Sequence, residues 1–454
     1  MKFTPRGITC LFFALATTVG CSSGDASDSS SEAYVQYYNA SPNSTATALV
    51  LDGYQYTAVS YADSQPRYVY STGSAEMEIV GTDEQGEELS LYTATLSLAN
   101  EDDHFFVLLG DYGATELLDI QYDRSEMDEL NSDESDDYSK MQMLVTHAAM
   151  NEPTYDIYFG IDGEGFSAAT MLDSLSYKGF STELMFDTGE YVLYLTEAGE
   201  TTPIYTTTAL DLSDNTVYKF VIRNSFGPGT PKITIDAVDS TGSPTQYANI
   251  DANAEYRVFN ALNNVDNIDI AIASNQETQY LYELGKHSLS DFKTIGYNDY
   301  GVTITNNDSS EVLANNLLVT FNQDESKSIL VYDDELGVTK GMTLTHDHRP
   351  RAFTHLIDLA NLVFDYETLA IYFVKPTETI ESAEYKITGL EFTELESISL
   401  ASGEYEINVV FEDENETLTL LYQSDPLVFD SAGNYTMVLS KDDSQPLGYR
   451  LTTF

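Results

Sequence analysis

The chain lacks tryptophan altogether and has only two cysteines among its 454 residues. Cys10 lies in an apolar N-terminal segment and Cys21 directly follows that segment, so the rest of the chain holds no thiol. No disulfide can therefore staple the folded part together. Each folded unit needs its own hydrophobic core, which roughly 100 residues can supply without staples or metals.

Basic residues are also scarce. The chain has 20 Lys and Arg against 74 Asp and Glu, a formal net charge of −54. A field of this sign repels nucleic acid and anionic membrane surfaces and attracts counter-cations. We therefore expect no nucleic-acid partner. The charge is typical of a protein kept soluble in a saline habitat, with specific cation binding as the alternative.

The one long apolar run lies at the N-terminus. Lys2 and Arg6 precede an apolar stretch over residues 8–19, too short for a stable spanning helix, and Gly20-Cys21 forms a small-residue cleavage point. The segment resembles a bacterial lipoprotein signal, although Thr18 stands where that family usually carries Leu. The alternative is an ordinary secretory signal in which Cys21 has no role.

The lipoprotein resemblance implies a location. Residues 1–20 would be removed, and Cys21 would be lipidated and become the first residue of the mature chain. Residues 21–32 are polar and predict a flexible tether. Ser22 follows Cys21 where an inner-membrane retention Asp would stand, which favours the outer membrane. We expect a bacterial envelope protein that is held to the membrane by its N-terminal lipid, on either the periplasmic or the surface face.

Aromatic residues are plentiful, with 33 Tyr and 21 Phe. From Asp187 to Ile222, apolar and polar residues alternate in runs broken by Gly, Asp and Asn, which predicts consecutive antiparallel strands. The unit opens with Gly189-Glu190-Tyr191 and recurs at Gly403-Glu404-Tyr405, with weaker copies beginning at Gly73 and Tyr300. Four copies predict four modules.

A second recurring feature opens each module. In the first, an apolar strand ends in Asn39-Ala40-Ser41-Pro42, and a second strand closes in Asp52-Gly53. We take Asn39, His147, Asn260 and Asp358 as equivalent positions, 108, 113 and 98 residues apart, which are domain-sized periods. The place of His147 and Asp358 at a strand end, equivalent to the Asn positions, predicts that these two residues cap the turn that follows.

This opening pattern resembles a domain of unknown function that occurs in tandem in bacterial surface proteins and lipoproteins. The resemblance is clearest in the first module and weakens afterwards. It implies an immunoglobulin-like β-sandwich and brings no established activity. The sequence therefore predicts an all-β chain of four tandem immunoglobulin-like β-sandwich modules, of six or seven strands each: module 1 (33–123), module 2 (139–238), module 3 (254–346) and module 4 (351–454).

Three polar segments connect the modules. The acidic segment 123–139 and the Ser/Asn/Asp-rich segment 239–254 predict flexible linkers, whereas 346–351 (HDHRPR) is short enough to fix modules 3 and 4 relative to each other.

Two groups of residues are candidates for metal binding. Asp133, Asp136 and Asp137 offer oxygen ligands for calcium, the one cofactor that we consider, although no D-x-D-x-D-G spacing is present. His346 and His348 would point to the same side of an extended strand, as a transition-metal site requires, but Arg349 and Arg351 stand beside them. In both places the sequence favours a solvated linker over a metal site.

No motif for catalysis is present. The one G-x-S-x-G string, residues 20–24, straddles the cleavage point, and no glycine-rich phosphate loop occurs. The sequence therefore predicts a non-enzymatic, lipid-anchored envelope protein that serves as an adhesion, spacer or binding scaffold with a protein or glycan partner. The alternatives are a solute- or glycan-binding lipoprotein and a single catalytic module on a β-sandwich stalk.

Overall fold

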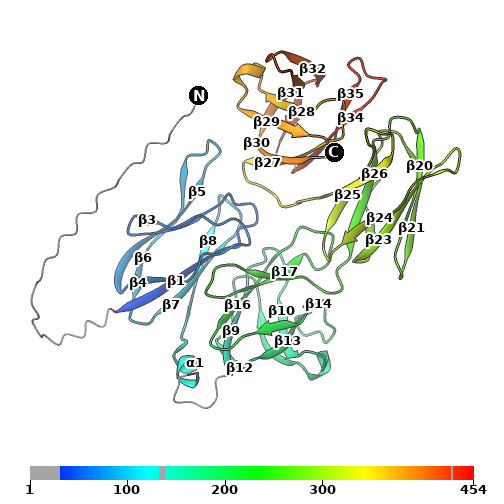
Figure 1. The fold of residues 1–454 in the computed structure, drawn as a ribbon. Helices are drawn as coiled ribbons and strands as arrows, with labels where there is room; N and C mark the ends of the chain where they lie inside the picture. The colour runs from blue at the N-terminus through cyan, green and yellow to red at the C-terminus, as the bar shows by residue number, and fades with distance from the viewer. Residues whose placement is uncertain (1–30, 132–138, 431–432) are drawn as a thin grey trace, which may run out of the picture.

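A computed structural model of the chain describes residues 31–131, 139–430 and 433–454, which form eight β-sheets. The sheets occur in pairs along the chain, and Figure 1 shows the four pairs as four separate bodies. The predicted class, all-β with tandem immunoglobulin-like β-sandwiches, is confirmed. The described part of each module contains eight to ten strands, more than the six or seven predicted, because short edge strands have no clear alternation.

All four modules share one topology. In what we call the inner sheet, the opening strand of the module lies parallel to a later strand: β1 with β7, β9 with β16, β19 with β25, and β27 with β34. In what we call the outer sheet, all neighbouring strands are antiparallel. Four repeats of the same mixed and antiparallel pair explain why the sequence pattern recurs at domain-sized intervals.

Modules 1 and 2 have the same strand order across each sheet, with additional edge strands in module 2. The inner sheet of module 1 contains, in this order, β4 (Tyr68–Ser71), β1 (Glu32–Asn39), β7 (Asp103–Leu109) and β8 (Glu116–Tyr122). Its outer sheet contains β3 (Tyr54–Gln55), β2 (Ala48–Leu51), β5 (Gly73–Thr82) and β6 (Glu88–Leu98). The inner sheet of module 2 contains β12 (Leu184–Asp187), β9 (Lys140–His147), β16 (Val217–Asn224), β17 (Ile233–Val238) and β18 (Thr245–Tyr247). Its outer sheet contains β11 (Thr170–Leu175), β10 (Tyr155–Ile161), β13 (Gly189–Glu197) and β14 (Tyr205–Thr206). The short strand β15 (Leu210–Leu212) also pairs with β13.

Modules 3 and 4 follow the same order. The inner sheet of module 3 contains β22 (Lys293–Ile295), β19 (Ala254–Asn260), β25 (Ser326–Asp333) and β26 (Thr339–Thr345). Its outer sheet contains β21 (Thr278–Gly285), β20 (Asn267–Ala273), β23 (Asn298–Asn306) and β24 (Val312–Phe321). The inner sheet of module 4 contains β30 (Leu395–Ala401), β27 (Thr354–Asn361), β34 (Tyr435–Lys441) and β35 (Tyr449–Thr453). Its outer sheet contains β29 (Tyr385–Glu391), β28 (Thr368–Val374), β31 (Gly403–Glu412) and β32 (Leu418–Gln423). The short strand β33 (Leu427–Phe429) also pairs with β31. The helical segments are α1 (Ser125–Leu130), η1 (Phe166–Ala168) and η2 (Ile380–Ser382).

Each module has its own hydrophobic core between its two sheets. The recurring Tyr of the Gly-Glu-Tyr unit lies at the edge of this core and hydrogen-bonds the backbone four residues upstream. The Tyr191 hydroxyl donates to the Asp187 carbonyl, and the Tyr405 hydroxyl to the Ala401 carbonyl. Tyr300 makes the same bond to Gly296 in module 3. The sequence repeat therefore reflects one corner bond used in three modules.

The turn-capping prediction is confirmed for His147 and wrong for Asp358. The Asn39 and Asn260 side-chain carbonyls accept from the backbone N–H two residues later, and His147 Nδ1 does the same. In module 4 this bond belongs to Asn361, which accepts from the Val363 N–H. Asp358 lies inside β27, where its carboxylate accepts from the Ser397 hydroxyl.

The segment 239–254, predicted as a flexible linker, is ordered by contacts with two modules. Residues Thr245–Tyr247 form β18 on the inner sheet of module 2. The Asp239 carbonyl accepts from the Gln36 side chain, and the Ser240 carbonyl accepts from the Arg67 N–H, both in module 1. The linker prediction is wrong here because polar composition does not reveal backbone partners supplied by another module.

The segment 123–139 is described as far as residue 131. It forms α1, and Met127 of this helix is fully buried between modules 1 and 2. None of the helices in the described part of the chain has the length and apolar character that a membrane crossing requires. The predicted signal (1–20), the lipidated Cys21 and almost all of the tether (21–32) lie outside the described residues.

Candidate functional site at the module junction

The central strands of the inner sheets are buried on both faces over much of their length. Every residue of β7 and of β17 is buried, although a strand with one solvent face would show buried and exposed residues in alternation. One face of each inner sheet packs in its own module, and the other face packs against a neighbouring module. Tyr38, Phe105 and Val107 of module 1 meet Leu144, Val217 and Val221 of module 2 in one apolar cluster.

Modules 3 and 4 pair in the same way. Phe259 and Leu330 of module 3 form a cluster with Ala360, Leu362 and Val438 of module 4, and all five are almost completely buried. The protein is therefore built from two pairs of sandwiches, each pair joined back to back through inner sheets.

The sequence carries a signal for this pairing that alternation alone does not reveal. Phe105-Phe106-Val107-Leu108-Leu109 is a continuous apolar run, and Met437-Val438-Leu439 is another. Strands with continuous apolar runs are buried on both faces. The two runs lie on inner strands, although the outer strand β28 has a similar run, Leu369-Ala370-Ile371-Tyr372-Phe373-Val374.

A buried polar network crosses the contact between modules 1 and 2. The Tyr38 hydroxyl of module 1 donates to the Asp236 carboxylate of module 2 over 2.6 Å. The same carboxylate accepts from Arg223 Nε over 2.7 Å, and Asp236 is fully buried. The guanidinium of Arg223 also lies 5.3 Å from the ring centre of Tyr61 in module 1. Burial raises the pKa of Tyr38 well above its usual value, so this hydroxyl keeps its proton and remains a donor.

Lys219 lies in the same contact, and no carboxylate of the described residues is at hydrogen-bond distance from it. It is 1% exposed, and its ammonium makes one long contact of 3.4 Å to the Val217 carbonyl. The rings of Phe105 and Tyr122 lie 5.8 and 5.4 Å away. Burial lowers the pKa of Lys219 to about 7, although the carboxylates of Asp103 and Asp239 oppose this shift.

The segment between modules 3 and 4 lies against module 1, more than 300 residues away in sequence. Arg349 Nη1 donates to the Pro42 and Ser44 carbonyls over 3.4 and 3.2 Å, and the Ala352 N–H donates to the Asn43 carbonyl over 2.9 Å. The rings of Phe353 and Tyr112 meet edge to face at 5.7 Å. We call residues 346–353 the clasp, because this segment joins the second pair of modules to the first.

Modules 2 and 3 meet on the other side of the clasp. The Asp324 carboxylate of module 3 accepts from the Ser225 hydroxyl and, over 2.6 Å, from the Gly229 N–H of module 2. Gly227 has to be a glycine, because a Cβ there would lie 2.0 Å from the Asp324 carbonyl oxygen. These contacts and the clasp close the four modules on one another, as Figure 1 shows.

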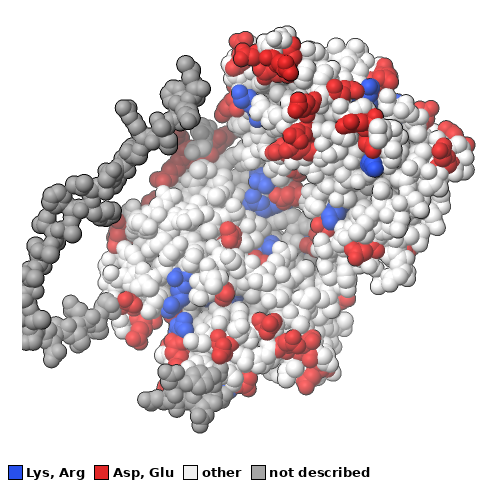
Figure 2. Space-filling model, viewed as in Figure 1, with Lys and Arg blue, Asp and Glu red and all other residues white. Residues whose placement is uncertain are grey.

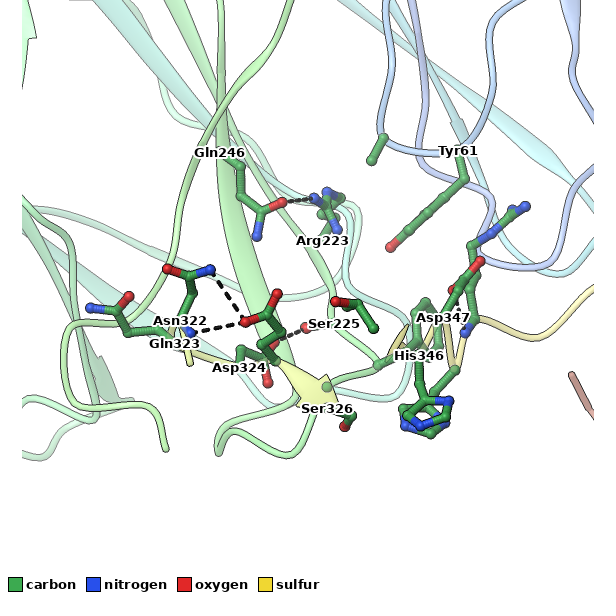
Figure 3. A pocket seen from close by; sticks show the side chains of 17 residues that line it. Tyr61, Arg223, Ser225, Gln246, Asn322, Gln323, Asp324, Ser326, His346 and Asp347 are labelled. Carbon is green, nitrogen blue, oxygen red and sulfur yellow. Dashed lines mark hydrogen bonds between the residues drawn. The ribbon is translucent and has the colours of Figure 1, made fainter. Parts of the chain in front are cut away.

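A polar cavity of about 370 Å³ lies where the clasp meets modules 1, 2 and 3. Figure 3 shows its side chains, among them Tyr61 from module 1, Arg223 and Gln246 from module 2, and Asp324 and His346 from module 3 and the clasp. Most of these side chains already have partners within the protein. Arg223 donates to Asp236 and to Gln246, and Asp347 accepts from the Arg349 N–H and from Arg351. The cavity is therefore a junction whose polar groups bind each other.

The two candidate histidines come together here. The rings of His346 and His348 stack with centres 5.7 Å apart, and both contact Phe292 edge to face. The prediction that they point to the same side is confirmed. His346 Nε2 and Nδ1 lie 2.7 Å and 3.3 Å from the hydroxyls of Ser328 and Thr436. Burial lowers the pKa of His346 to about 3, so the ring is neutral at physiological pH.

A metal at this pair would need further ligands. His348 Nε2 is 3.8 Å from Glu255 Oε1. Burial lowers the pKa of His348 as well. In residues 31–131, 139–430 and 433–454, no group of three His, Cys, Asp or Glu side chains is arranged to hold a metal ion. In this structure the pair packs and hydrogen-bonds. The calcium candidates Asp133, Asp136 and Asp137 lie outside the described residues, and calcium binding there stays a prediction.

A second cavity, of about 500 Å³, lies between modules 3 and 4. Acidic side chains line it, with Asp333, Asp334 and Glu335 on one side and Asp443 on the other. Burial raises the pKa of Asp333, and backbone hydrogen bonds lower that of Asp334. Figure 2 shows that acidic side chains occur on all parts of the visible face, so this group is one example of a general surface property.

No protein-family model matches the chain, and no curated protein matches it. The resemblance to a tandem domain of unknown function therefore stays a prediction. Among solved structures, the chain is similar to the Bacillus anthracis TIE protein, with 10% identity over 90% of this chain and 68% of that one and a TM-score of 0.15. It is also similar to BcpA, the major pilin subunit of Bacillus cereus, with 10% identity over 66% of this chain and 98% of that one and a TM-score of 0.14. Because both TM-scores are so low, neither similarity indicates what this chain does.

Proposed function

We propose that the chain is a non-enzymatic scaffold of the bacterial envelope, held to the membrane through a lipid on Cys21. The observation that carries the proposal is the burial of both faces of the central strands of the inner sheets. This burial uses the second face of the inner sheets for contacts between modules. The outer sheets are left as the surfaces available to a partner.

The closed arrangement changes which kind of scaffold we propose. A spacer gains reach from modules placed end to end, and flexible linkers would allow this. Here the clasp and the segment 239–243 lie against module 1 instead. We therefore propose a compact binding or adhesion platform rather than a stalk.

A catalytic module was the alternative. An active site needs polar groups free to act on a substrate, and polar side chains at the junction such as Arg223, Asp324 and Asp347 already bind other groups of the protein. No specific observation favours catalysis over binding.

The anchor is tested with the Cys21→Ser variant in a bacterial host that processes lipoproteins. We expect the parent chain in the membrane fraction with an acylated N-terminal cysteine by mass spectrometry, and the variant in the soluble fraction. Equal membrane retention of the variant would contradict the lipid anchor. Cys10→Ser is the matched control, because Cys10 lies inside the segment expected to be removed.

A further inference from the structure

The outer sheet of module 3 differs from those of the other modules on its solvent face. In module 1 this face carries Glu76 and Glu78 in the middle of β5, and in module 4 it carries Lys386 and Glu406. In module 2 the Phe166 ring of η1 packs against Tyr158 and Tyr194 and covers that face. The middle of the face in module 3 has no charged side chain and no covering segment among the described residues.

Small residues form the floor of this face. On β20 and β23, Ile268, Ile270, Ile272, Val302 and Ile304 point into the core, which leaves the residues between them on the solvent side. Ala271 pairs with Thr303, and Ala273 pairs with Gly301. The two central strands therefore present only methyl groups, a hydroxyl and bare backbone over this stretch.

Taller side chains rise from the two outer strands. On β21, Tyr280 and Tyr282 are 51% and 69% exposed, and their rings are parallel, with an angle of 6° between the planes and 5.8 Å between the centres. On β24, Asn315 and Asn316 face the same side, and Asn315 accepts from the Thr303 hydroxyl. The Asn316 side chain lies over Gly301, since a Cβ on that glycine would be 2.0 Å from Asn316 Oδ1. Leu318 on β24 pairs with Gly301 and is 75% exposed, so it stands on the same side. The result is a shallow trough with a tyrosine wall and a second wall of two amides and a leucine.

Among the described residues, the charged groups of this face lie toward the ends of the trough, and they include the exposed Glu283 next to Tyr282. Asp269 accepts from the Asn307 amide and from the Glu283 N–H, and Asp299 accepts from the Thr320 hydroxyl. The middle of this trough is uncharged and has two exposed tyrosines, although the chain has a net charge of −54. An anionic ligand would be repelled by the surrounding field, and a cationic ligand would find no free carboxylate in the middle.

We propose that this trough on the outer sheet of module 3 binds an uncharged glycan chain. Parallel aromatic rings offer flat apolar faces against which the C–H faces of sugar rings stack. The Asn315 and Asn316 amides and the Thr303 hydroxyl supply both donors and acceptors for sugar hydroxyls. Figure 1 shows β20 and β21 at the right-hand edge of the molecule, away from the other modules, where a long chain can lie across the sheet.

The inference deepens the proposed platform role and rests on it, but it does not depend on the lipid anchor. The chain has no tryptophan, so Tyr282→Trp places a single indole on the tyrosine wall of the full chain. Titration with cello-, manno-, malto-, laminari- and chito-oligosaccharides is expected to shift the indole emission saturably for at least one of them. Tyr54→Trp, on the equally exposed Tyr54 of module 1, is the matched control and is expected to give no shift.

Affinity for the bound sugar is then compared by calorimetry between the unsubstituted chain and two variants. Tyr280→Ala is expected to weaken binding about tenfold through the loss of ring contact, and Ala271→Arg to weaken it at least as much by filling the floor. Neither residue belongs to the module core, so both variants are expected to keep the parent melting temperature. Failure of all five sugars to bind, or equal affinity in Tyr280→Ala, would overturn the proposal. Because the measurement is made in solution, such a failure is distinct from a failure of the Cys21 anchor.

Discussion

At the contact between modules 1 and 2, one buried cation is paired with a carboxylate and another is not. The Asp236 carboxylate accepts from both Arg223 and the Tyr38 hydroxyl, so the positive charge of Arg223 is paired with a negative charge. Lys219 has no such partner among the described residues, and Asp103 acts on it only at longer range. An ammonium taken out of water without a partner costs free energy, which the apolar contacts around it must exceed.

Lys219→Met is therefore expected to stabilise the protein, by roughly 1–4 kcal/mol at pH 7. Because the folded-state pKa is lowered to about 7, the cost is fully present below that pH and is relieved as the pH rises toward the unfolded-state value of about 10.4. The unfolding free energy of the parent should rise between pH 7 and 9 relative to that of the variant, as measured by urea denaturation. A less stable variant with a parallel pH profile would show that Lys219 is compensated.

A second prediction tests the corrected equivalence in module 4. Asn361 is fully buried and hydrogen-bonds the Val363 N–H and the Leu390 and Glu391 carbonyls. Asn361→Ala leaves these groups unpaired and should cost about 2–3 kcal/mol. Asp358→Ala, in the same strand, loses one bond to Ser397 and should cost less than about 1 kcal/mol. Thermal unfolding of the two variants decides which residue caps the turn, and a larger loss at Asp358 would contradict the assignment.

At the scale of single elements, the sequence predicts the outer sheets better than the inner ones. Alternation over residues 73–79 and 403–407 follows strands with one solvent face, and the outer-sheet hairpin turns at Asp83 and Asp413 are capped by these Asp side chains. Alternation fails for β7 and β17 because a neighbouring module buries their second face. Alternation also fails for β27. The pattern indicated that this strand ends at Asp358, but the strand continues to Asn361.

Val221→Asp tests the double burial of an inner sheet. Val221 points toward module 1, whereas its neighbours Phe220 and Ile222 point into the core of module 2. A carboxylate at Val221 would be buried without a partner and should destabilise the contact by several kcal/mol while leaving the module 2 core intact. Differential scanning calorimetry should then show a separate, earlier transition in place of cooperative melting of modules 1 and 2. An unchanged melting profile would contradict a tight contact.

At the scale of the whole molecule, four acidic sandwiches fold back on one another instead of extending. The contacts that do this are non-local: Arg349 meets residues more than 300 positions away, and Tyr38 meets Asp236 across 198 positions. The sequence could show the repeated sandwich units, because these depend on local pattern. It could not show which module each linker contacts, because the partner carbonyls of Pro42 and Ser44 have no side-chain signature.

The clasp is tested by hydrogen exchange at the Ala352 amide, which donates to the Asn43 carbonyl. Arg349→Ala removes the two bonds from the guanidinium to module 1 and should speed this exchange about tenfold or more. Arg351→Ala is the control, because its ion pair is with Asp347 of the same segment. Equal exchange in the two variants would mean that the guanidinium of Arg349 does not hold the clasp.

Small-angle X-ray scattering of the full chain in solution tests the closed arrangement most directly. A compact chain of this length has a radius of gyration of about 22 Å, and the N-terminal segment adds a little to it. The contacts among all four modules predict a value close to that, at physiological ionic strength. A radius roughly twice as large, as for sandwiches strung end to end, would contradict the central claim that the modules close on one another.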